Sequence, residues 1–438
     1  MEYMPLIFFA VLLIMLMAGF PVAFTLGGVS FLFGVFTFGF DFFNLLPMRV
    51  WGIMNNYILL AVPLFIYMGV MFEKSGLAEE LLETMALLFG KLRGGMAISV
   101  LIVGALLAAA TGIVGATVVT MGVLTLPTML KKGYNPEVAT GIISASGTLG
   151  QIIPPSIVLV LLGSVLNVSV GELFMGAVIP GFILVFLYLV WIITISIVKP
   201  KLAPAMPKED LAKFNLENKT KKILIAFIAP FVLITAVLGS IFAGVASPTE
   251  AAAVGAIGAT ILTAIRGKLN KQILQDVMTS TMNLTSMTFM ILVGAAAFGL
   301  VFRGMGGDHV LTNLILHNNI EANHFLIIVM IMIFIAGFFI DFIEITFIIV
   351  PVVAPIFVHL GIDLLWIGIL IAVNLQTSFL TPPFGFALFF LKGVAPEGIT
   401  TKHIYKGVLP YVVIQLVGLT LLIIFPELVL WLPKYLGY

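Results

Sequence analysis

Residues 151–156 read QIIPPS and residues 380–385 read LTPPFG, so a Pro-Pro pair interrupts each of two long apolar segments. An offset of 228 residues places Pro154-Pro155 on Pro382-Pro383. The same offset relates two earlier positions in each segment, Pro127 with Pro355 and Gly133 with Gly361. Repeated halves that contain discontinuous helices are how secondary transporters build a midplane site that can face either side of a membrane. The repeat therefore predicts a transport protein.

The composition indicates an all-α polytopic membrane protein that sits in a lipid bilayer. Of the 438 residues, 61% are hydrophobic and only 9% are charged, and a soluble protein of this length could not bury so much apolar surface. The formal net charge of +1 indicates no nucleic-acid partner, and the absence of cysteine excludes thiol chemistry. Five histidines without an HxxxH pair argue against a zinc or haem site, so no cofactor is expected. Residues 1–20 lack a basic start and a cleavage site, and we interpret them as a retained span.

Apolar runs divide each copy of the repeat into a helical hairpin and a broken helix. The hairpins are expected over residues 94–131 and 324–360, and the broken helices over 136–166 and 364–392. The hairpins are interpreted as re-entrant because their runs are short and their tips are polar or Gly-rich.

Three further segments are predicted from local patterns. Residues 77–92 place three glutamates on one face and leucines on the other, which is typical of a helix lying along the membrane interface. Residues 269–282 are interpreted as a second interfacial stretch that precedes a span over 284–302. Residues 247–250, SPTE, predict a helix start with a capping box.

Charge decides the expected orientation. If both broken helices cross once and both hairpins enter and leave on the same side, only Arg49, Arg303 and Lys434 fall outside, and 18 of 21 basic residues share one side. The positive-inside rule makes that side the cytoplasm. Both termini are then expected in the periplasm, the hydrophilic loop 199–222 is cytoplasmic, and the two copies are inverted relative to each other.

The two breaks and the hairpin tips are the candidate binding site. A Pro-Pro pair frees backbone carbonyls, which a bilayer tolerates only where they are buried in protein or face a cavity, and these suit a hard cation such as Na⁺. The half-helix that starts after each break points a partial positive charge at an anion. The expected Na⁺ ligands are Thr111, Gly112, Gly115, Thr117, Ser146, Thr148, Pro154, Asp341, Asn374, Thr377 and Thr381. The expected substrate contacts are Ser144, Gly150, Pro155, Ser156, Gln376, Pro383 and Gly385.

Purely structural interpretations also remain open for these residues. A single Pro-Pro is often a simple kink, although two at matched positions argue against that. Each Ser or Thr is explained equally well as a packing contact between helices. Asp341 lies in an apolar stretch without Lys or Arg, and it is expected to ligate Na⁺, carry a proton or cap the following helix.

At these residues the chain resembles the large membrane subunit of tripartite ATP-independent periplasmic (TRAP) transporters. The resemblance covers nearly the whole chain. It is carried by Thr111–Thr117, Leu126-Pro127, Lys132–Tyr134, Gly150–Ser156, Ser247–Val254, Asp341, Asn374-Leu375 and Thr381–Gly385. One departure is Glu344, which with bulky neighbours follows Asp341 where family members often have small or hydroxyl residues.

The resemblance implies an elevator-type importer of small organic anions, a carboxylate or a sulfonate, coupled to Na⁺ in the bacterial inner membrane. A small four-helix membrane subunit and a periplasmic substrate-binding protein would be its partners. The implied division is scaffold helices in 1–72 and 171–302, arm helices in 73–93 and 303–323, transport-domain repeats in 94–170 and 324–395, and a C-terminal helix in 396–438.

Three alternatives remain at this stage. A standalone Na⁺/dicarboxylate symporter of the divalent-anion type has a similar inverted-repeat design and needs no binding protein. An intramembrane enzyme would use Asp341, with Glu344 as the only candidate second carboxylate. A channel is a third alternative, although hairpins that close a site favour alternating access.

Overall fold

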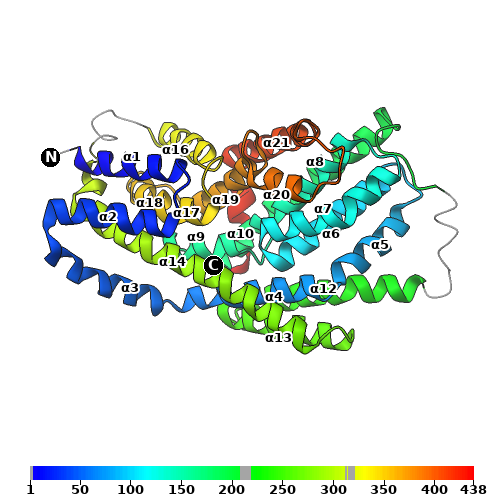
Figure 1. Ribbon diagram of the computed structural model, residues 1–438, viewed down its shortest axis with the longest axis horizontal. Coiled ribbons are helices and arrows are strands. Elements are labelled where there is room, and N and C mark those ends of the chain that lie inside the picture. Colours follow the sequence, from blue (N-terminus) through cyan, green and yellow to red (C-terminus); the bar gives the residue numbers. More distant parts are fainter. Residues whose placement is uncertain (1–2, 208–218, 311–312, 314–320) are drawn as a thin grey trace.

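The computed structural model describes residues 3–207, 219–310, 313 and 321–438, and within this part every regular element is a helix (Figure 1). The first third contains α1 (Met4–Met17), α2 (Val22–Phe38), η1 (Phe40–Leu45), α3 (Leu46–Met54), η2 (Tyr57–Leu60), α4 (Ala61–Lys74), α5 (Leu77–Phe89), α6 (Gly95–Thr111) and α7 (Val114–Lys131). The middle contains α8 (Pro136–Thr148), η3 (Leu149–Gln151), α9 (Ile157–Leu166), α10 (Val170–Val198), α12 (Lys219–Phe242), α13 (Pro248–Ile265) and α14 (Lys271–Gly304). The last part contains α16 (Ala322–Ala336), α17 (Phe342–Ile348), α18 (Val350–His359), α19 (Leu364–Leu380), α20 (Phe386–Val394), α21 (Thr401–Ile424) and α22 (Glu427–Leu436).

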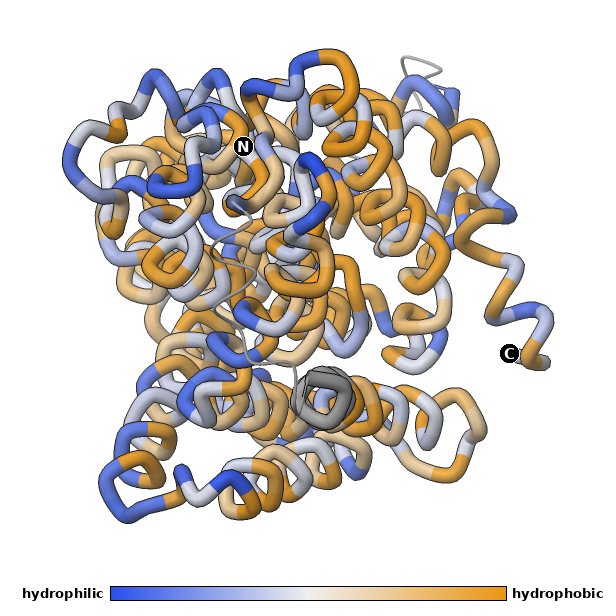
Figure 2. Tube along the Cα trace, turned by 90° about the vertical axis from the view of Figure 1, so that its right-hand side faces the viewer, coloured by the Kyte–Doolittle hydropathy of each residue, from blue (hydrophilic) through white to orange (hydrophobic). Residues whose placement is uncertain are grey.

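These helices make the chain a multi-pass membrane protein. Six of them in the described residues are long and apolar enough to cross a bilayer, or seven if α17 and α18, which meet at 50°, count as one span. Figure 2 shows apolar residues on the helices throughout the molecule, with hydrophilic residues concentrated in the connections. The all-helical membrane fold predicted from composition is confirmed.

The helices pack in two groups. In the first group α4 contacts α13 and α14, and α14 also packs on α2. In the second group α8 is surrounded by α6, α7 and α21, and α19 contacts α10, α16 and α21. Figure 1 shows α4 and α13 along one edge and α21 and α8 along the other, and Figure 2 shows α13's side of the molecule as a separate row of helices.

Glycines allow the closest helix crossings. A Cβ on Gly141 of α8 would lie 2.1 Å from the carbonyl oxygen of Gly407 in α21, and a Cβ on Gly407 would lie 2.2 Å from the carbonyl oxygen of Glu137. Only glycine on both helices permits this backbone approach. The crossing draws α21 onto the first broken helix.

Helices α10 and α21 pack against helices of both repeats. The division suggested by the sequence placed residues 171–302 and 396–438 outside the two repeats. In the structure, α10 contacts α6, α9, α19 and α21, and α21 contacts α8, α19 and α20. Both helices are apolar on most of their surface, so their sequences carry no preferred face from which their neighbours could be predicted.

Two local predictions differ from the structure. Residues 271–304 form one helix, α14, rather than an interfacial stretch and a separate span, because no Gly or Pro interrupts residues 271–293. Residues 396–438 form two helices rather than one, because α21 ends before Pro426, and α22 starts at the next residue.

Two other segments have clear outcomes. The capping box predicted at residues 247–250 is confirmed, since Ser247 and Glu250 cap each other's backbone at the start of α13. The apolar side of α5 is buried and the helix contacts α6 and α12, while Glu79 and Glu83 are exposed. Most of the predicted arm helix at 303–323 lies outside the described residues.

Candidate functional site

The tip of the first hairpin lies between α6 and α7. Gly112 ends α6 with φ of +61°, a conformation that favours glycine. The Thr117 hydroxyl donates to the Ile113 carbonyl at 3.0 Å, so the Thr111 hydroxyl is the donor in its 2.8 Å bond to Thr117. A Cβ on Gly112 would lie 3.3 Å from the backbone nitrogen of Ile157, so this tip touches the start of α9.

The first break leaves the N-terminus of α9 without a side-chain cap. After α8 the chain passes through η3 and the cis Pro154-Pro155 bond before α9 begins. Ser156 occupies the N-cap position, but its hydroxyl donates to the Gln151 carbonyl at 2.8 Å. The first backbone N–H groups of α9 therefore keep their positive field for another acceptor.

The second break has the same organisation. Pro382-Pro383 is also a cis bond, and Gly385, which has no side chain to serve as a cap, precedes α20. The Thr381 hydroxyl donates to the Thr377 carbonyl at 2.7 Å, and the Tyr405 hydroxyl donates to the Pro383 carbonyl. Both breaks therefore end in a short half-helix whose N-terminus has no side-chain hydrogen bond.

The tip of the second hairpin carries two carboxylates. Asp341 is the N-cap of α17, where it accepts from the Phe342 backbone at 2.7 Å, and Glu344 accepts from the Asp341 backbone at 3.0 Å. Glu344 is 8% exposed, and neither carboxylate forms an ion pair with a described residue. The structure thus shows the capping geometry that was one of three expectations for Asp341, and it leaves the half-buried Asp341 and the buried Glu344 without a basic partner.

The two breaks meet in the interior. Helix α19 contacts both α8 and η3, and the Gln376 amide donates to the Thr148 hydroxyl at 3.5 Å. The helix that follows each hairpin tip packs on the second half of the other copy's broken helix. Helix α7 contacts α20, and α17 contacts α9. Each tip therefore lies against a broken helix, and all four parts surround one region.

Four of the expected ligands are closely packed against neighbouring helices. Gly115 is in α7, where a Cβ would meet the Phe390 ring at 2.9 Å. Ser146 packs against Gly104 of α6, and the Asn374 amide donates to the Met330 carbonyl at 2.7 Å. Gly150 lies against the Ala108 carbonyl, at 2.7 Å from a built Cβ. These four residues have close packing contacts of their own within the described part of the chain.

Three polar residues that were not among the expected ligands also lie here. Gln151 in η3 is fully buried, and neither its amide nitrogen nor its amide oxygen has a hydrogen-bond partner among the described residues. Tyr188 and Gln415 are fully buried in α10 and α21. In the sequence, Gln151 is part of the first predicted break, and Gln415 is a lone amide in an apolar stretch.

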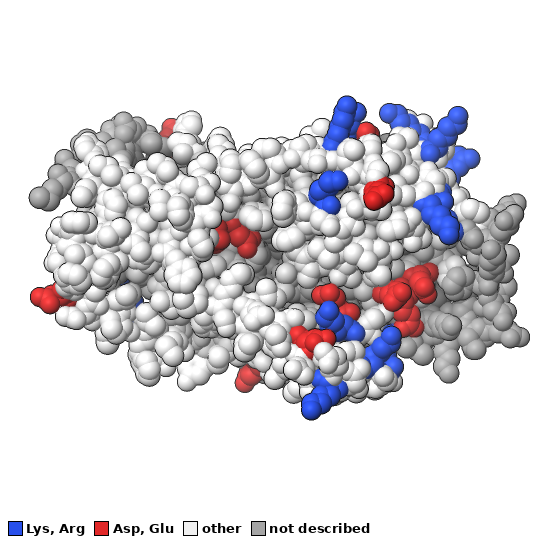
Figure 3. All heavy atoms as spheres, in the orientation of Figure 1, with Lys and Arg blue, Asp and Glu red and all other residues white. Residues whose placement is uncertain are grey.

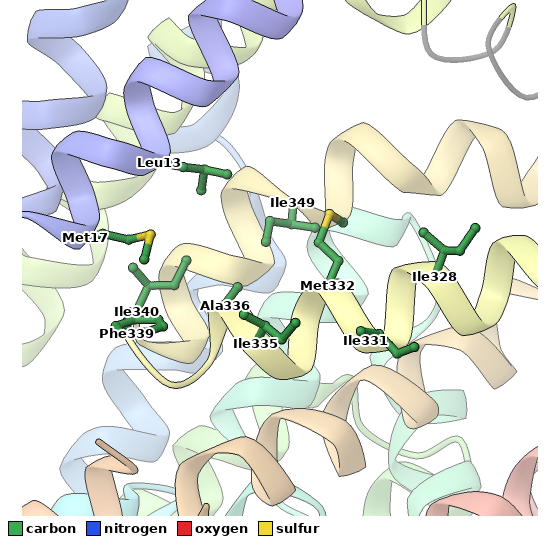
Figure 4. A pocket seen from close by; sticks show the side chains of 10 residues that line it. All are labelled: Leu13, Met17, Ile328, Ile331, Met332, Ile335, Ala336, Phe339, Ile340 and Ile349. Atoms are coloured by element: carbon green, nitrogen blue, oxygen red, sulfur yellow. The ribbon is translucent and has the colours of Figure 1, made fainter. Parts of the chain in front are cut away.

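Two cavities border this region. One, of about 470 Å³, lies between α1 and the second hairpin and is lined only by apolar side chains such as Met17, Ile335 and Phe339 (Figure 4). It offers no ligand to an anion or a cation. The other, of about 510 Å³, is lined by polar groups that include Arg49, Arg303 and Asp308.

Comparison with known proteins identifies the family of this chain. Residues 9–428 match the family described as the tripartite ATP-independent periplasmic transporter, DctM component. The chain belongs to this family. Such a large permease works together with a small permease and a periplasmic binding protein. The resemblance seen in the sequence is thereby confirmed.

Individual relatives agree with this assignment. The C4-dicarboxylate TRAP transporter large permease DctM of Pseudomonas aeruginosa is 32% identical over 94% of both chains. The sialic acid TRAP transporter large permease SiaM of Vibrio cholerae is 28% identical over 97% of both chains. The crystal structure of the Alcanivorax borkumensis YdaH transporter superposes with a TM-score of 0.65 over 99% of this chain and 100% of the other, at 16% identity, and so shows likeness of fold.

Membership in the TRAP large permeases decides between transporter and enzyme, and between TRAP permease and standalone symporter. The relatives of this chain are named as transporter permeases, so the chain is a secondary transporter subunit and not an enzyme. The match to the DctM family rather than to a standalone symporter also removes the divalent-anion alternative.

Proposed function

We propose that this TRAP large permease imports a small organic anion together with Na⁺, and that both bind where the two breaks and the two hairpin tips meet. The observation that carries the proposal is the meeting of the breaks, marked by the hydrogen bond between Gln376 and Thr148. These residues are 228 positions apart, which is also the offset of the sequence repeat.

The charges at the site support Na⁺ as the coupling ion. Glu344 is buried and Asp341 is half-buried at the second hairpin tip, and the stretch from Phe334 to Val353 contains no Lys or Arg. Buried carboxylates without a basic partner are costly unless a cation or a proton neutralises them. A Na⁺ ion beside the second tip would do so, and the paired hydroxyls of Thr111 and Thr117 offer oxygen ligands at the first tip.

The substrate is proposed to lie between the N-termini of α9 and α20. Neither broken helix contains a basic residue within 142–166 or 364–391, so an anion would be held by backbone N–H groups and by bound cations. A carboxylate or a sulfonate suits such a site. The substrates named for two relatives, a C4-dicarboxylate and sialic acid, are acids of this kind.

An elevator movement and an orientation follow from the same proposal. On the face drawn in Figure 3, Lys and Arg gather at the right-hand end of the molecule, which the positive-inside rule would place in the cytoplasm. The termini would then be periplasmic. Arg49 and Arg303 would line a periplasmic cavity whose field attracts an arriving anion. Helices α10 and α21 would move with the breaks that they contact.

Thermal unfolding of the purified permease with its small subunit tests the coupling ion. Na⁺ would be exchanged for K⁺ at constant ionic strength, since a ligand at about 100 times its Kd stabilises by roughly 2.7 kcal/mol. The variants are Asp341→Ala and, as control, Asp363→Ala. Asp363 caps α19 by accepting from Leu365 at 2.7 Å, so the control also loses an N-cap carboxylate.

The proposal expects a Na⁺-specific shift that Asp341→Ala weakens and Asp363→Ala leaves intact. Both variants lose about 0.5–2 kcal/mol of helix capping, so lowered stability alone does not distinguish them. A shift unchanged in Asp341→Ala would move the Na⁺ site to the first hairpin. If no variant responds to Na⁺, Na⁺ coupling is wrong, and proton coupling through Asp341 becomes the hypothesis to pursue.

A further inference from the structure

A series of buried polar side chains joins the two broken helices through α10 and α21. The Gln415 amide donates to the Tyr188 hydroxyl at 2.7 Å, and the Gln376 side chain lies close to that hydroxyl. The Gln376 amide donates to the Thr148 hydroxyl at 3.5 Å, and that hydroxyl donates to the Ala145 carbonyl at 2.9 Å. We call Gln415, Tyr188, Gln376 and Thr148 the buried relay.

The donors and acceptors of the buried relay follow one another in one direction. Tyr188 accepts from Gln415, so its own proton is available to a second group. The Gln376 side-chain oxygen forms no hydrogen bond with any described residue, and the Gln376 side chain lies beside the Tyr188 hydroxyl. All four side chains are 0% exposed, so no water from the surface replaces a lost partner. Removing one member therefore leaves others unsatisfied.

One bond of the buried relay lies at the junction of the two copies. Thr148 and Gln376 are 228 residues apart, which is the offset of the repeat, so this bond joins equivalent positions of the two broken helices. Tyr188 and Gln415 lie outside both copies, and their bond joins α10 to α21, the helices that pack behind the breaks.

The same bonds add to the expected role of Thr148 and Gln376. Both were expected as ligands, Thr148 for Na⁺ and Gln376 for substrate. In the structure the Thr148 proton and one Gln376 donor are engaged within the protein, while the Gln376 oxygen is without a partner among the described residues. These bonds fix the ends of α8 and α19 beside the breaks, in addition to any role of the two side chains as ligands.

We propose that Tyr188 and Gln415 are positioning residues of the transport site, which hold the two broken helices in register so that both half-sites bind as one unit. Neither residue lies in a break or a hairpin tip. The inference rests on the proposed function because one of its two readouts uses Na⁺. The other readout, amide exchange at the breaks, does not depend on which ion is coupled.

The first experiment measures the Na⁺ midpoint of thermal stabilisation in Tyr188→Phe, with the permease and its small subunit. This variant removes one hydroxyl and keeps the ring, which packs edge-on against Tyr411 at 5.1 Å. Tyr411→Phe is the matched control, because Tyr411 is the other ring of this pair and no hydrogen bond of its hydroxyl is found among the described residues. We expect the midpoint to rise about tenfold in Tyr188→Phe, which corresponds to ~1.4 kcal/mol, and to stay unchanged in the control.

A double variant separates positioning from stability. Gln415→Leu combined with Tyr188→Phe removes both partners of one bond, so less polar surface is left buried and unpaired than in Tyr188→Phe alone. We expect thermal stability to recover in part while the Na⁺ midpoint stays raised. Recovery of both together would show that the relay only contributes stability, and would overturn the proposal.

The second experiment follows hydrogen exchange of the backbone amides in residues 149–157 and 376–386 without added Na⁺. Positioning by the relay predicts faster exchange at both breaks in Tyr188→Phe and no change in Tyr411→Phe, since exchange reports local opening. Exchange that rises only in α10 and α21 refutes the proposal. If the wild type does not respond to Na⁺ at all, the proposed coupling ion is wrong, and this exchange experiment still decides the role of the relay.

Discussion

Replacing Gly69 by alanine should weaken Na⁺ binding from outside the binding site. Gly69 lies on α4, and a Cβ there would stand 2.5 Å from the Thr111 Cα and 2.8 Å from the Thr111 carbonyl oxygen. Ordinary contact begins near 3.4 Å, so the tip of the first hairpin must retreat by roughly 0.9 Å, and only backbone is available to give way. One turn further along α4, Glu73 accepts a hydrogen bond from Thr120 of the same hairpin at 3.3 Å, so a second contact ties α4 to this hairpin.

The size of the effect follows from the clash. Inserting one methyl group into a packed interface typically costs about 1–3 kcal/mol, and alanine returns up to ~1 kcal/mol of helix propensity. If this net cost of about 1–2 kcal/mol destabilises the Na⁺-bound conformation, the affinity for Na⁺ falls by roughly 5–30-fold. The displaced Thr111 hydroxyl is a proposed ligand, and metal ligands tolerate shifts of only about 0.2 Å.

Na⁺ titration of thermal unfolding in Gly69→Ala is the assay. Gly28→Ala is the matched control, because Gly28 is also inside a helix, α2, and a Cβ there meets nothing within 4 Å. The control should keep the wild-type Na⁺ midpoint and gain a little stability. A wild-type midpoint in Gly69→Ala would refute the reasoning, since it would mean that the tip can move without disturbing the site.

Three further changes have distinct expected outcomes. Gly407→Ala should lower the unfolding temperature of the permease markedly, because its Cβ would lie 2.2 Å from the Glu137 carbonyl oxygen, and an unchanged temperature would contradict this crossing. Thr117→Val keeps side-chain volume but removes the acceptor of Thr111, so the Na⁺ midpoint should rise while stability in K⁺ changes by less than about 1.5 kcal/mol. Arg266→Gln breaks the ion pair with Glu80 of α5, and because Glu80 is 40% exposed the loss of stability in thermal unfolding should stay within about 1 kcal/mol.

The parts of the fold that could be predicted are those encoded locally. Continuous apolar runs predicted a helical membrane protein, and the Ser247–Glu250 pattern predicted the start of α13, because hydropathy and capping act within one helix. The continuity of α14 was misjudged because a polar first half suggested an interfacial segment, although nothing in its backbone ends the helix there. The packing of α10 and α21 on the breaks could not be predicted, since their apolar surfaces point in every direction.

The candidate site was predictable in outline only. The matched Pro-Pro pairs mark both breaks, and both short half-helices are present. Which polar groups face those breaks depends on helix rotation, which a nearly uniform apolar sequence does not reveal. Gly115 thus faces Phe390, while Gln151, which was not among the expected ligands, lies buried in the first break. A lone amide in an apolar helix is the signal that deserved more weight.

Two capping boxes in this chain show why a motif does not define a function by itself. Ser247 and Glu250 form one at an exposed helix start, where Glu250 accepts from the Ser247 backbone at 2.7 Å. Asp341 and Glu344 form another at the second hairpin tip, where Glu344 accepts from the Asp341 backbone at 3.0 Å and Asp341 accepts from the Phe342 backbone at 2.7 Å.

Water and counterions neutralise the exposed acid, so capping alone accounts for the box at Ser247. At the hairpin tip the same geometry places two carboxyl groups one turn apart, away from most water, and the partial charge of a short helix is too small to neutralise both if they ionise. The cap at Asp341 therefore explains how the tip folds, while the pair of acids still requires a cation or a proton. Capping and ion binding are thus compatible roles for one residue, and burial is what separates the two boxes.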